Sequence, residues 1–412
     1  MILFLVHFLR DVLHLQLPTV FSYYSTRMAL AALTSMAICI FFGPMFIRKL
    51  YAMKIGQPIR KDECPLLGEL HSKKENTPTM GGVLVLVAML VSLALWMDWK
   101  SAFTLILLIA TIWLGLLGAA DDYLKLKHKN SKGLAGRKKM AWQLLFAGLL
   151  GLYLLFPTVA DGVHVGRWFS PPVAKERMAS AYSLDGDKEE LNKARPALGT
   201  RDYTSHLYIP FVKKHLLTFS GFFLVLLWLL IVFVVVGSSN AVNLTDGLDG
   251  LAAGCLMFAA GALALIAFMQ NHVGLAEYLH IIYIEGSGEV AIYLSAMVGA
   301  CLGFLWYNGH PAQVFLGDTG ALALGGILGV AAVLMKRELL FAIIGGVFVA
   351  EALSVIVQVG GYKFLNRKRF FRCAPLHHHF EYKGWPETKV VVRFWIVGLL
   401  LAIVGVASLK FQ

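Results

Sequence analysis

Two adjacent carboxylates at the end of a long apolar segment are the first residues whose types could do chemistry. Asp121 and Asp122 directly follow the segment that ends at Ala120, and ionisable groups so close to hydrocarbon cost free energy and are often functional. Two neighbouring carboxylates repel each other unless a proton or a cation lies between them. The alternative is a hydrated helix end that binds nothing, and the pair alone does not decide between these interpretations.

A second group repeats an oxygen-bearing side chain at every third residue. Asn243, Asp246 and Asp249 lie in the segment Asn-Leu-Thr-Asp-Gly-Leu-Asp-Gly, and this spacing predicts that they share one side of a helical turn. Gly247 and Gly250 allow the backbone to approach a ligand closely. A helix cap needs one such residue rather than three, so the repeat favours ligand binding.

A third group combines an amide, an aromatic ring and a carboxylate before an apolar segment. Asn308-Gly-His-Pro is followed by Phe315-Leu-Gly-Asp-Thr-Gly, which contains Asp318. Asp318 could act as the N-cap of the helix that begins there, and this role is compatible with metal binding. The group therefore adds a third candidate carboxylate to the two at Asp121 and Asp122.

The remaining two groups carry positive or titratable nitrogen. Lys73 and Lys74 precede Thr77-Pro-Thr-Met-Gly-Gly, which includes Thr79, and ammonium and hydroxyl groups before a helix N-terminus suit an anion. The segment Pro-Leu-His-His-His-Phe-Glu at 375–381 does not have the ligand spacing of a zinc site. We expect its histidines to donate hydrogen bonds to a phosphate or a nucleoside.

Carboxylates and phosphate-binding cations together favour Mg²⁺, which proteins hold through oxygen ligands and substrate phosphates. The five cysteines form no Cys-x-x-Cys pair, so we predict that they are structural and that no soft-metal site exists. The chemistry these groups imply is phosphoryl transfer, in which positioning and charge neutralisation supply most of the catalysis.

Membrane-spanning helices have to position these groups. The chain of 412 residues is 58% hydrophobic and 15% charged, with a mean hydropathy of +0.68. About 20 apolar residues cross a bilayer, and only helices satisfy the backbone of such a segment. We therefore predict an all-α polytopic membrane protein forming one domain over residues 1–412. The ten predicted spans are 24–47, 80–97, 102–120, 140–158, 218–237, 247–269, 289–307, 320–335, 339–362 and 392–410.

The distribution of Lys and Arg predicts the orientation of these spans. Loops 48–79, 121–139 and 363–393 carry seven, seven and eight cations, which places them in the cytoplasm and both termini in the periplasm. All five polar groups then lie on the cytoplasmic side. The long loop 159–217 is predicted to be a periplasmic insertion. The net charge of +12 is assigned to loops facing anionic lipid, so no nucleic-acid partner is expected.

Taken together, the motifs resemble a known family. The Asp121–Asp122 pair and the segment 243–250 are similar to those of polyprenyl-phosphate N-acetylhexosamine-1-phosphate transferases. The strings Thr-Pro-Thr-Met-Gly-Gly at 77–82 and Pro-Leu-His-His-His-Phe-Glu at 375–381 resemble those of the narrower phospho-N-acetylmuramoyl-pentapeptide transferase family. The likeness covers nearly the whole chain. The resemblance implies an enzyme of the bacterial inner membrane with ten spans, Mg²⁺ and a homodimer. Its implied substrates are UDP-MurNAc-pentapeptide and undecaprenyl phosphate, and its implied products are lipid I and UMP.

The resemblance also implies roles for individual residues. Asp318 is the expected principal Mg²⁺ ligand, and Asp121, Asp122 and Asp246 are further candidates. Asp121 and Asp122 would lie near the diphosphate, one of them serving as a base, and we favour direct attack over a covalent intermediate. Phe315 would stack on uracil. The remaining expected site residues are Lys74, Thr79, Asn243, Asp249, Asn308, Gln358, His377 and His378, of which His377 is placed among the catalytic residues.

Two polar residues inside the ninth predicted span stand apart from the motifs. Glu351 and Gln358 are seven residues apart and share a helical face. We expect them to be buried and paired inside the bundle, with Gln358 near the cytoplasmic site.

Two other functions remain open from the residues. A UDP-GlcNAc:polyprenyl-phosphate transferase would share the carboxylate motifs and differ in its donor. A nucleotide-sugar or lipid transporter would also place polar residues beside broken helices, but its binding site should lie near the bilayer midplane. The gathering of polar groups at one predicted face favours the transferases.

Overall fold

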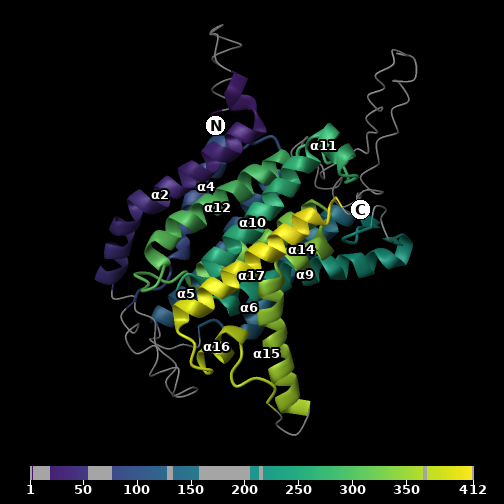
Figure 1. Cartoon of the computed structure of the whole chain (residues 1–412). Helices are drawn as coiled ribbons and strands as arrows, with labels where there is room; N and C mark the ends of the chain where they lie inside the picture. The colour runs from purple at the N-terminus through teal and green to yellow at the C-terminus, as the bar shows by residue number, and fades with distance from the viewer. Residues whose placement is uncertain are drawn as a thin grey trace, which may run out of the picture.

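The computed structural model describes residues 2, 19–53, 77–127, 133–156, 205–212, 217–364 and 369–410, and it is a bundle of long helices (Figure 1). One ladder of two short antiparallel strands is the only sheet in these ranges. The elements are η1 (Thr19–Ser22), α2 (Tyr24–Ala52), α4 (Gly82–Trp96), α5 (Ala102–Lys127), α6 (Gly136–Leu155), β1 (His206–Leu207), β2 (Leu217–Thr218), η5 (Gly221–Phe223), α9 (Leu224–Thr245), α10 (Leu251–Gln270), α11 (Val273–Tyr278), α12 (Gly288–Asn308), α13 (Gly317–Leu334), α14 (Glu338–Ile344), α15 (Gly346–Phe364), α16 (Leu376–Glu381) and α17 (Glu387–Ala407).

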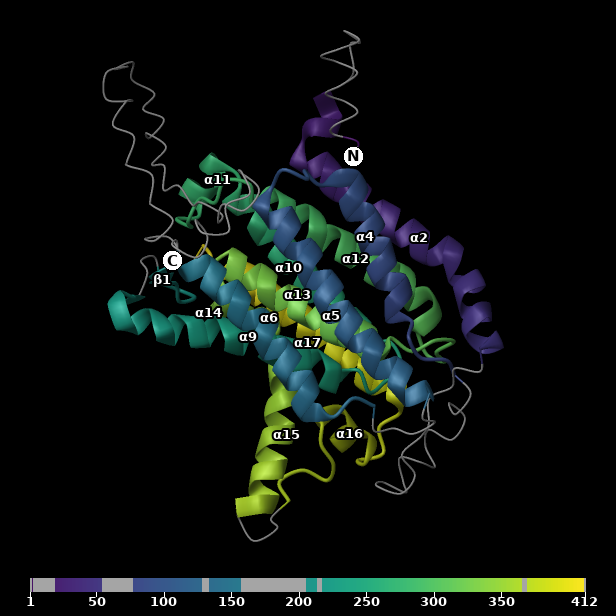
Figure 2. The same ribbon diagram turned by 180° about the vertical axis from the view of Figure 1, so that it is seen from behind.

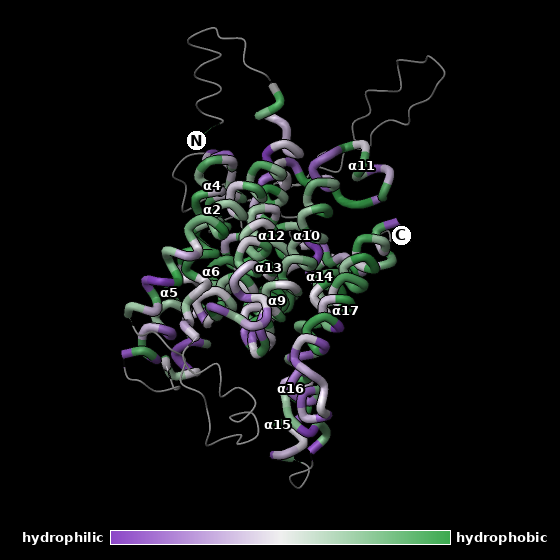
Figure 3. Tube along the Cα trace, turned by 60° about the vertical axis from the view of Figure 1, so that its left-hand side comes forward, coloured by the Kyte–Doolittle hydropathy of each residue, from purple (hydrophilic) through white to green (hydrophobic). Residues whose placement is uncertain are grey.

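Within the described residues, eight helices are long and apolar enough to cross a membrane. They are α2, α5, α9 extended by η5, α10, α12, α13, α15 and α17, and α4 is a shorter apolar helix. The predicted span 140–158 corresponds to α6, whose first turn carries three cations. Figure 3 shows hydrophobic residues along these helices, while hydrophilic residues gather around α16 and the far end of α15.

The predicted span 339–362 is broken near its start, because the structure divides it into two helices, of which the second is a candidate span. α14 ends at Ile344 and α15 begins at Gly346, with Gly345 between them. A Cβ atom at Gly345 would lie 3.1 Å from the Phe341 carbonyl oxygen, so the chain is tightly packed at this break. Beyond the break, α15 projects from the bundle on the same side as α16 (Figure 1).

The centre of the bundle is α13, which packs against α4, α5, α9 and α10 (Figure 2). Nearly all of α13 is buried, which requires small residues on several faces. A Cβ atom at Gly82 of α4 would lie 2.1 Å from the backbone nitrogen of Gly320, so only glycine fits there. This contact brings the start of α4 directly against the start of α13.

The order of the helices brings distant polar segments to one end of the bundle. The last residues of α5 and α9 lie at the same end of the bundle as the first residues of α4 and α13. We call this end of the bundle the site end. At the opposite end, Arg27 near the start of α2 pairs with Glu289 at the start of α12. The predicted Lys73 and Lys74, and most of the loop 159–217, lie outside the described residues.

Candidate active site

Three carboxylates from two helices meet at the site end. Asp121 and Asp122 occupy the last turns of α5, Asp318 occupies the first turn of α13, and one ligand oxygen from each lies within 4.8 Å of the others. Asp121 and Asp122 are each 1% exposed. Because α5 and α13 touch at Gly118, where a Cβ would lie 2.4 Å from the Asp318 carbonyl oxygen, the helices can approach closely enough to form this cluster.

Asp122 caps α13 from the neighbouring helix. Its carboxylate accepts hydrogen bonds from the backbone nitrogens of Asp318 (3.2 Å) and Thr319 (2.9 Å) and from the Thr319 hydroxyl (2.7 Å). The expected N-cap role of Asp318 is therefore wrong, since Asp318 lies inside the first turn and its amide is one of the groups being capped. Its own carboxylate is left to face the cluster.

Two lysines that the motifs did not reveal neutralise part of the cluster. Lys125 of α5 places its Nζ 2.6 Å from Asp121 and 3.0 Å from Asp318. Lys139 of α6 places its Nζ 2.5 Å from Asp318 and 3.2 Å from Asp121. Lys125 follows Asp121 by four residues, a spacing that predicts a contact on a helix. Lys139 gave no such signal, because it comes from a separate helix.

The repeat at 243–250 does not stay on one side of a helix. α9 ends at Thr245, so only Asn243 is helical, and its Nδ2 donates to Asp318 at 3.0 Å. Asp246 accepts a hydrogen bond from the Gly317 amide. Burial, together with the nearby Asp318 and Asp122 charges, raises the pKa of the Asp246 carboxyl to about 7.

Asp249 turns away from the cluster toward the loop after α12. Its Oδ2 accepts from the Ala312 amide at 3.1 Å and lies 3.1 Å from His310 Nδ1, while its own amide donates to Glu387 at 2.8 Å. Asn308 joins the same two loops, because it accepts from the Gly250 amide at 3.1 Å and donates to the Val314 carbonyl at 2.8 Å. Asp249, His310 and Glu387 form a second group with closely spaced ligand atoms.

Thr79 and Phe315 lie in two segments that pair through their backbones. Phe315 donates to the Pro78 carbonyl at 2.8 Å and accepts from the Gly81 amide at 2.8 Å. Thr79 is buried beside Gly317, whose φ of +73° is a conformation that favours glycine. These bonds hold both residues close to the start of α13, which carries Asp318, whereas Lys74 is outside the described residues.

The histidine segment packs against the 243–250 segment and against α15. His377 of α16 is fully buried, and its Nε2 would lie 2.3 Å from a Cβ built on Gly247. His378 Nδ1 pairs with Glu381 at 2.6 Å. His379 packs edge-on against Phe371, and partial burial beside Lys383 and Arg372 lowers the pKa of its imidazole.

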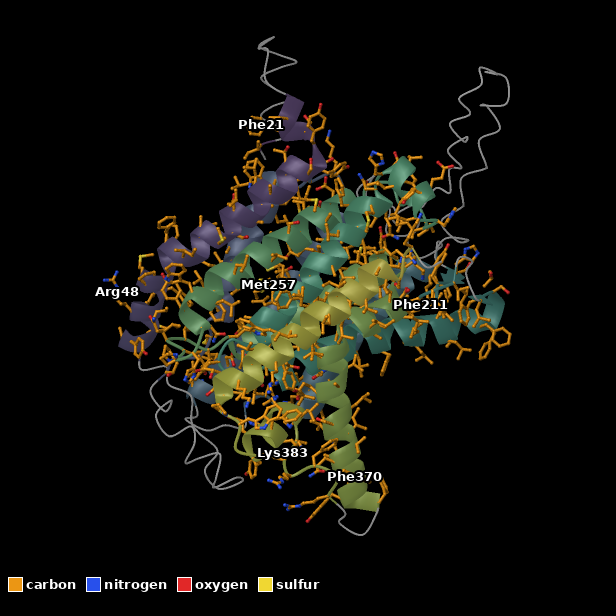
Figure 4. The ribbon with its side chains drawn as sticks, in the orientation of Figure 1. Phe21, Arg48, Phe211, Met257, Phe370 and Lys383 are labelled. Carbon is orange, nitrogen blue, oxygen red and sulfur yellow. The ribbon has the colours of Figure 1, made fainter. Side chains whose placement is uncertain are left out.

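Glu351 and Gln358 do not pair with each other, which corrects the expectation for these two residues. Gln358 accepts from the amides of Phe370 and Phe371 and donates to the Phe371 carbonyl at 2.9 Å. Glu351 instead contacts His377. Both side chains therefore fix the segment that precedes α16, and Figure 4 shows Phe370 beside α15 and Lys383 beside α16.

The donor set of the acid cluster fits a hard divalent cation. Asp121, Asp122 and Asp318 offer only oxygen ligands, and three ionised carboxylates against two ammonium groups leave one negative charge in excess. Both Asp122 oxygens accept hydrogen bonds from backbone amides of α13, whereas oxygens of Asp121 and Asp318 face the side chains of Lys125 and Lys139, which can move aside for a cation. Asp246 does not belong to the group within 4.8 Å. Mg²⁺ suits such a site.

Comparisons with known proteins place this bundle with an acidic cluster at one end among membrane-embedded transferases. The model of Glycosyl transferase family 4 matches residues 195–336, and that of the phospho-N-acetylmuramoyl-pentapeptide-transferase signature 1 matches residues 74–86. The chain is 60% identical over 412 residues to the phospho-N-acetylmuramoyl-pentapeptide-transferase of Protochlamydia amoebophila (strain UWE25), covering 100% of both chains. It is 44% identical over 393 residues to that of Thermodesulfovibrio yellowstonii (strain ATCC 51303 / DSM 11347 / YP87), covering 95% of both.

The chain belongs to the phospho-N-acetylmuramoyl-pentapeptide-transferase family. The resemblance predicted from the motifs is thereby confirmed. The comparisons also confirm the predicted class of enzyme and its part in peptidoglycan synthesis. They confirm that the chain is a multi-pass protein of the bacterial inner membrane.

Proposed function

We propose that the chain transfers phospho-MurNAc-pentapeptide from UDP-MurNAc-pentapeptide to undecaprenyl phosphate, giving lipid I and UMP. The observation that carries the proposal is the meeting of Asp121, Asp122 and Asp318 within 4.8 Å at the site end, in a chain of this family. An oxygen of the lipid phosphate attacks the phosphorus next to the sugar. The bond from that phosphorus to the bridging oxygen breaks, and this oxygen leaves with UMP.

The cluster's own residues divide the work of this transfer. Mg²⁺ held by Asp318 and Asp121 would neutralise charge on the diphosphate and on the departing UMP. Lys125 and Lys139 bring two further positive charges to the same carboxylates, within reach of a phosphate bound there. Asp121 accepts a proton from a monoprotonated lipid phosphate, so a direct attack needs no covalent enzyme intermediate.

The nucleoside is assigned to the loops beside the cluster. Phe315 offers a partly exposed ring for stacking on uracil, and its backbone bonds to the segment containing Thr79 hold it in place. Asp249 and Asn308 tie the 246–250 and 308–314 loops together, which fixes both loops close to Phe315. Lys74, Asp246, Gln358 and His378 complete the proposed binding set.

We further propose that the site end faces the cytoplasm and both termini face the periplasm. The cation-rich loops 48–79, 121–139 and 363–393 support this orientation. In this arrangement α4 and α6 are added to the eight candidate spans and complete ten crossings, the chain forms one domain over 1–412, and the 159–217 insertion is periplasmic. The active protein is proposed to be a homodimer.

The nearest rival, a UDP-GlcNAc transferase, is disfavoured by the signature matched at residues 74–86. A transporter is disfavoured because the site residues that the structure describes gather at one end of the bundle rather than midway along it. Detergent-purified protein should therefore release UMP from UDP-MurNAc-pentapeptide only when Mg²⁺ and a polyprenyl phosphate are present. Exclusive use of UDP-GlcNAc, or uptake of donor into vesicles without UMP release, would overturn the proposal.

A further inference from the structure

Glu351 is a carboxylate buried in an apolar helix with no exposed surface. Such a group is costly unless it is paired and hydrogen-bonded. Its partners come from one residue twenty-six positions away: Glu351 Oε1 accepts from the His377 amide at 3.1 Å, and Oε2 lies 3.2 Å from His377 Nδ1. The ring contact is within ion-pair distance, although it is not aligned as a hydrogen bond.

We infer that Glu351 is a positioning residue that holds the proton of His377 on Nδ1 and so presents Nε2 to the Gly247 turn of the proposed active site. A carboxylate can only accept, so its presence 3.2 Å from Nδ1 favours the tautomer that is protonated there. The same contact persists when the imidazole is doubly protonated. In both states Nε2 is the ring atom left to exchange a proton or a hydrogen bond with a ligand.

The surroundings of Nε2 point to a ligand rather than to a structural partner. His377 has no exposed surface, and Nε2 has no hydrogen-bond partner among the described residues. The atom faces Gly247, the residue between Asp246 and the Asp249 turn, where any side chain would collide with the ring. A buried ring nitrogen without a partner is costly, and a substrate group at this loop would satisfy it.

The backbone contact makes a sharp test available. In Glu351→Gln, the amide oxygen has to remain on the His377 amide, because that backbone group can only donate. The new NH₂ group then faces Nδ1 and, having no lone pair to offer, favours the tautomer with the ring proton on Nε2. This variant keeps size and burial but inverts the tautomer.

The inference rests on the proposed role of His377 at the active site. UMP release is measured under saturating donor and lipid for Glu351→Gln, His377→Gln and the double variant. We expect kcat of Glu351→Gln to fall about 10- to 100-fold with little change in KM for the UDP donor. In the His377→Gln background, Glu351→Gln should cause no further loss, because the two residues act as one unit.

Glu289→Gln is the matched control, since it makes the same change at a buried carboxylate at the opposite end of the bundle. It should lower the melting temperature without lowering kcat of the folded protein. If Glu351→Gln is recovered in too small a yield, Glu351→Asp replaces it, because this variant keeps the charge, lengthens the ring contact and should show a smaller loss of kcat.

Unchanged kcat in Glu351→Gln, or in Glu351→Asp where that variant replaces it, would overturn the inference. Equal losses from Glu351→Gln with and without His377 would overturn it as well. Full turnover by His377→Gln would instead remove His377 from the proposed catalytic set.

Discussion

Two clusters of buried charge that lie at opposite ends of the bundle differ in their balance. At the opposite end, Arg27 Nη2 contacts both Glu289 oxygens at 2.7 and 2.8 Å, and Arg27 Nε donates to the Trp96 carbonyl at 2.7 Å. The Asp98 amide donates to the same carboxylate at 2.9 Å. One cation meets one anion, and the backbone supplies the remaining contacts.

At the site end, three carboxylates share two lysines, and Lys125 and Lys139 each contact more than one of them. The charges do not cancel, and no rearrangement of these five side chains can make them cancel. A balanced buried pair connects α2 to α12, whereas an unbalanced cluster is stable only with a further cation or proton. The Arg27–Glu289 pair is therefore structural, whereas the acid cluster is suited to bind a ligand. Mutations at the two ends should have different consequences.

The largest effect is expected from Asp318→Ala. Loss of the carboxylate that both lysines and Asn243 contact should reduce kcat on the order of 10⁴-fold, or roughly 5 kcal/mol of barrier. UMP release by purified protein measures this loss, and the melting temperature verifies folding. Normal turnover by the folded variant would remove Asp318 from the proposed site.

Breaking the Arg27–Glu289 pair at the opposite end should lower the stability of the protein rather than its activity. Arg27→Met leaves Glu289 buried without its cation and should reduce the free energy of unfolding by about 3–5 kcal/mol. The double variant Arg27→Met/Glu289→Met should recover most of this loss. Thermal unfolding in detergent measures both, and kcat of the folded fraction should stay unchanged. A catalytic defect without a stability defect would erase the distinction between the two ends.

Lys139→Met sharpens the comparison from within the site. Removing one of two positive charges next to Asp318 should lower kcat about 10²-fold, near 2.7 kcal/mol, because less positive charge stabilises the transferred phosphate. Lys138→Met, one residue earlier on an exposed part of the same helix, is the control and should keep full activity. Equal losses in the two variants would point to a general charge effect.

Removal of Mg²⁺ should lower the free energy of unfolding through the site end and not through the opposite end. Mg²⁺ at ten times its Kd should stabilise the protein by about 1.4 kcal/mol, and a chelator should remove this gain. The shift should persist in Arg27→Met and disappear in Asp318→Ala. A shift of equal size in Asp318→Ala would place the metal elsewhere.

The smallest effect is a pH dependence at Asp246. Its folded pKa of about 7 lies above the usual value, so its contribution to stability is complete below pH ~4 and is lost as pH rises through 7. Without divalent metal, the protein should be more stable at pH 6 than at pH 8 by less than ~1 kcal/mol, because partial exposure screens the effect. Asp246→Asn should abolish the difference, and a difference that persists in this variant would exclude Asp246 as its source.

Sequence patterns singled out the carboxylates of the acid cluster, but not the lysine that contacts them or the carboxylate that contacts His377. Asp121, Asp122 and Asp318 stood out because carboxylates beside apolar segments are rare. Lys139 could not be found this way, since lysines at the ends of loops beside membrane spans have a general topological role. The contact between Glu351 and His377 was not predicted either. The seven-residue spacing associated Glu351 with Gln358 on its own helix, whereas His377 follows the next loop.

Residue type and local spacing determined the helices, their approximate bounds and the identity of the acidic motifs, because apolar length and charge at its ends are properties of contiguous segments. The tertiary structure decided which of these groups meet. Glycines on α4, α5 and α13 set the approach of the helices, so that Asp122 caps α13, Lys139 reaches Asp318 and Asp249 turns to another loop. Such pairings depend on the packing of segments far apart in the chain, and no spacing along the sequence specifies them.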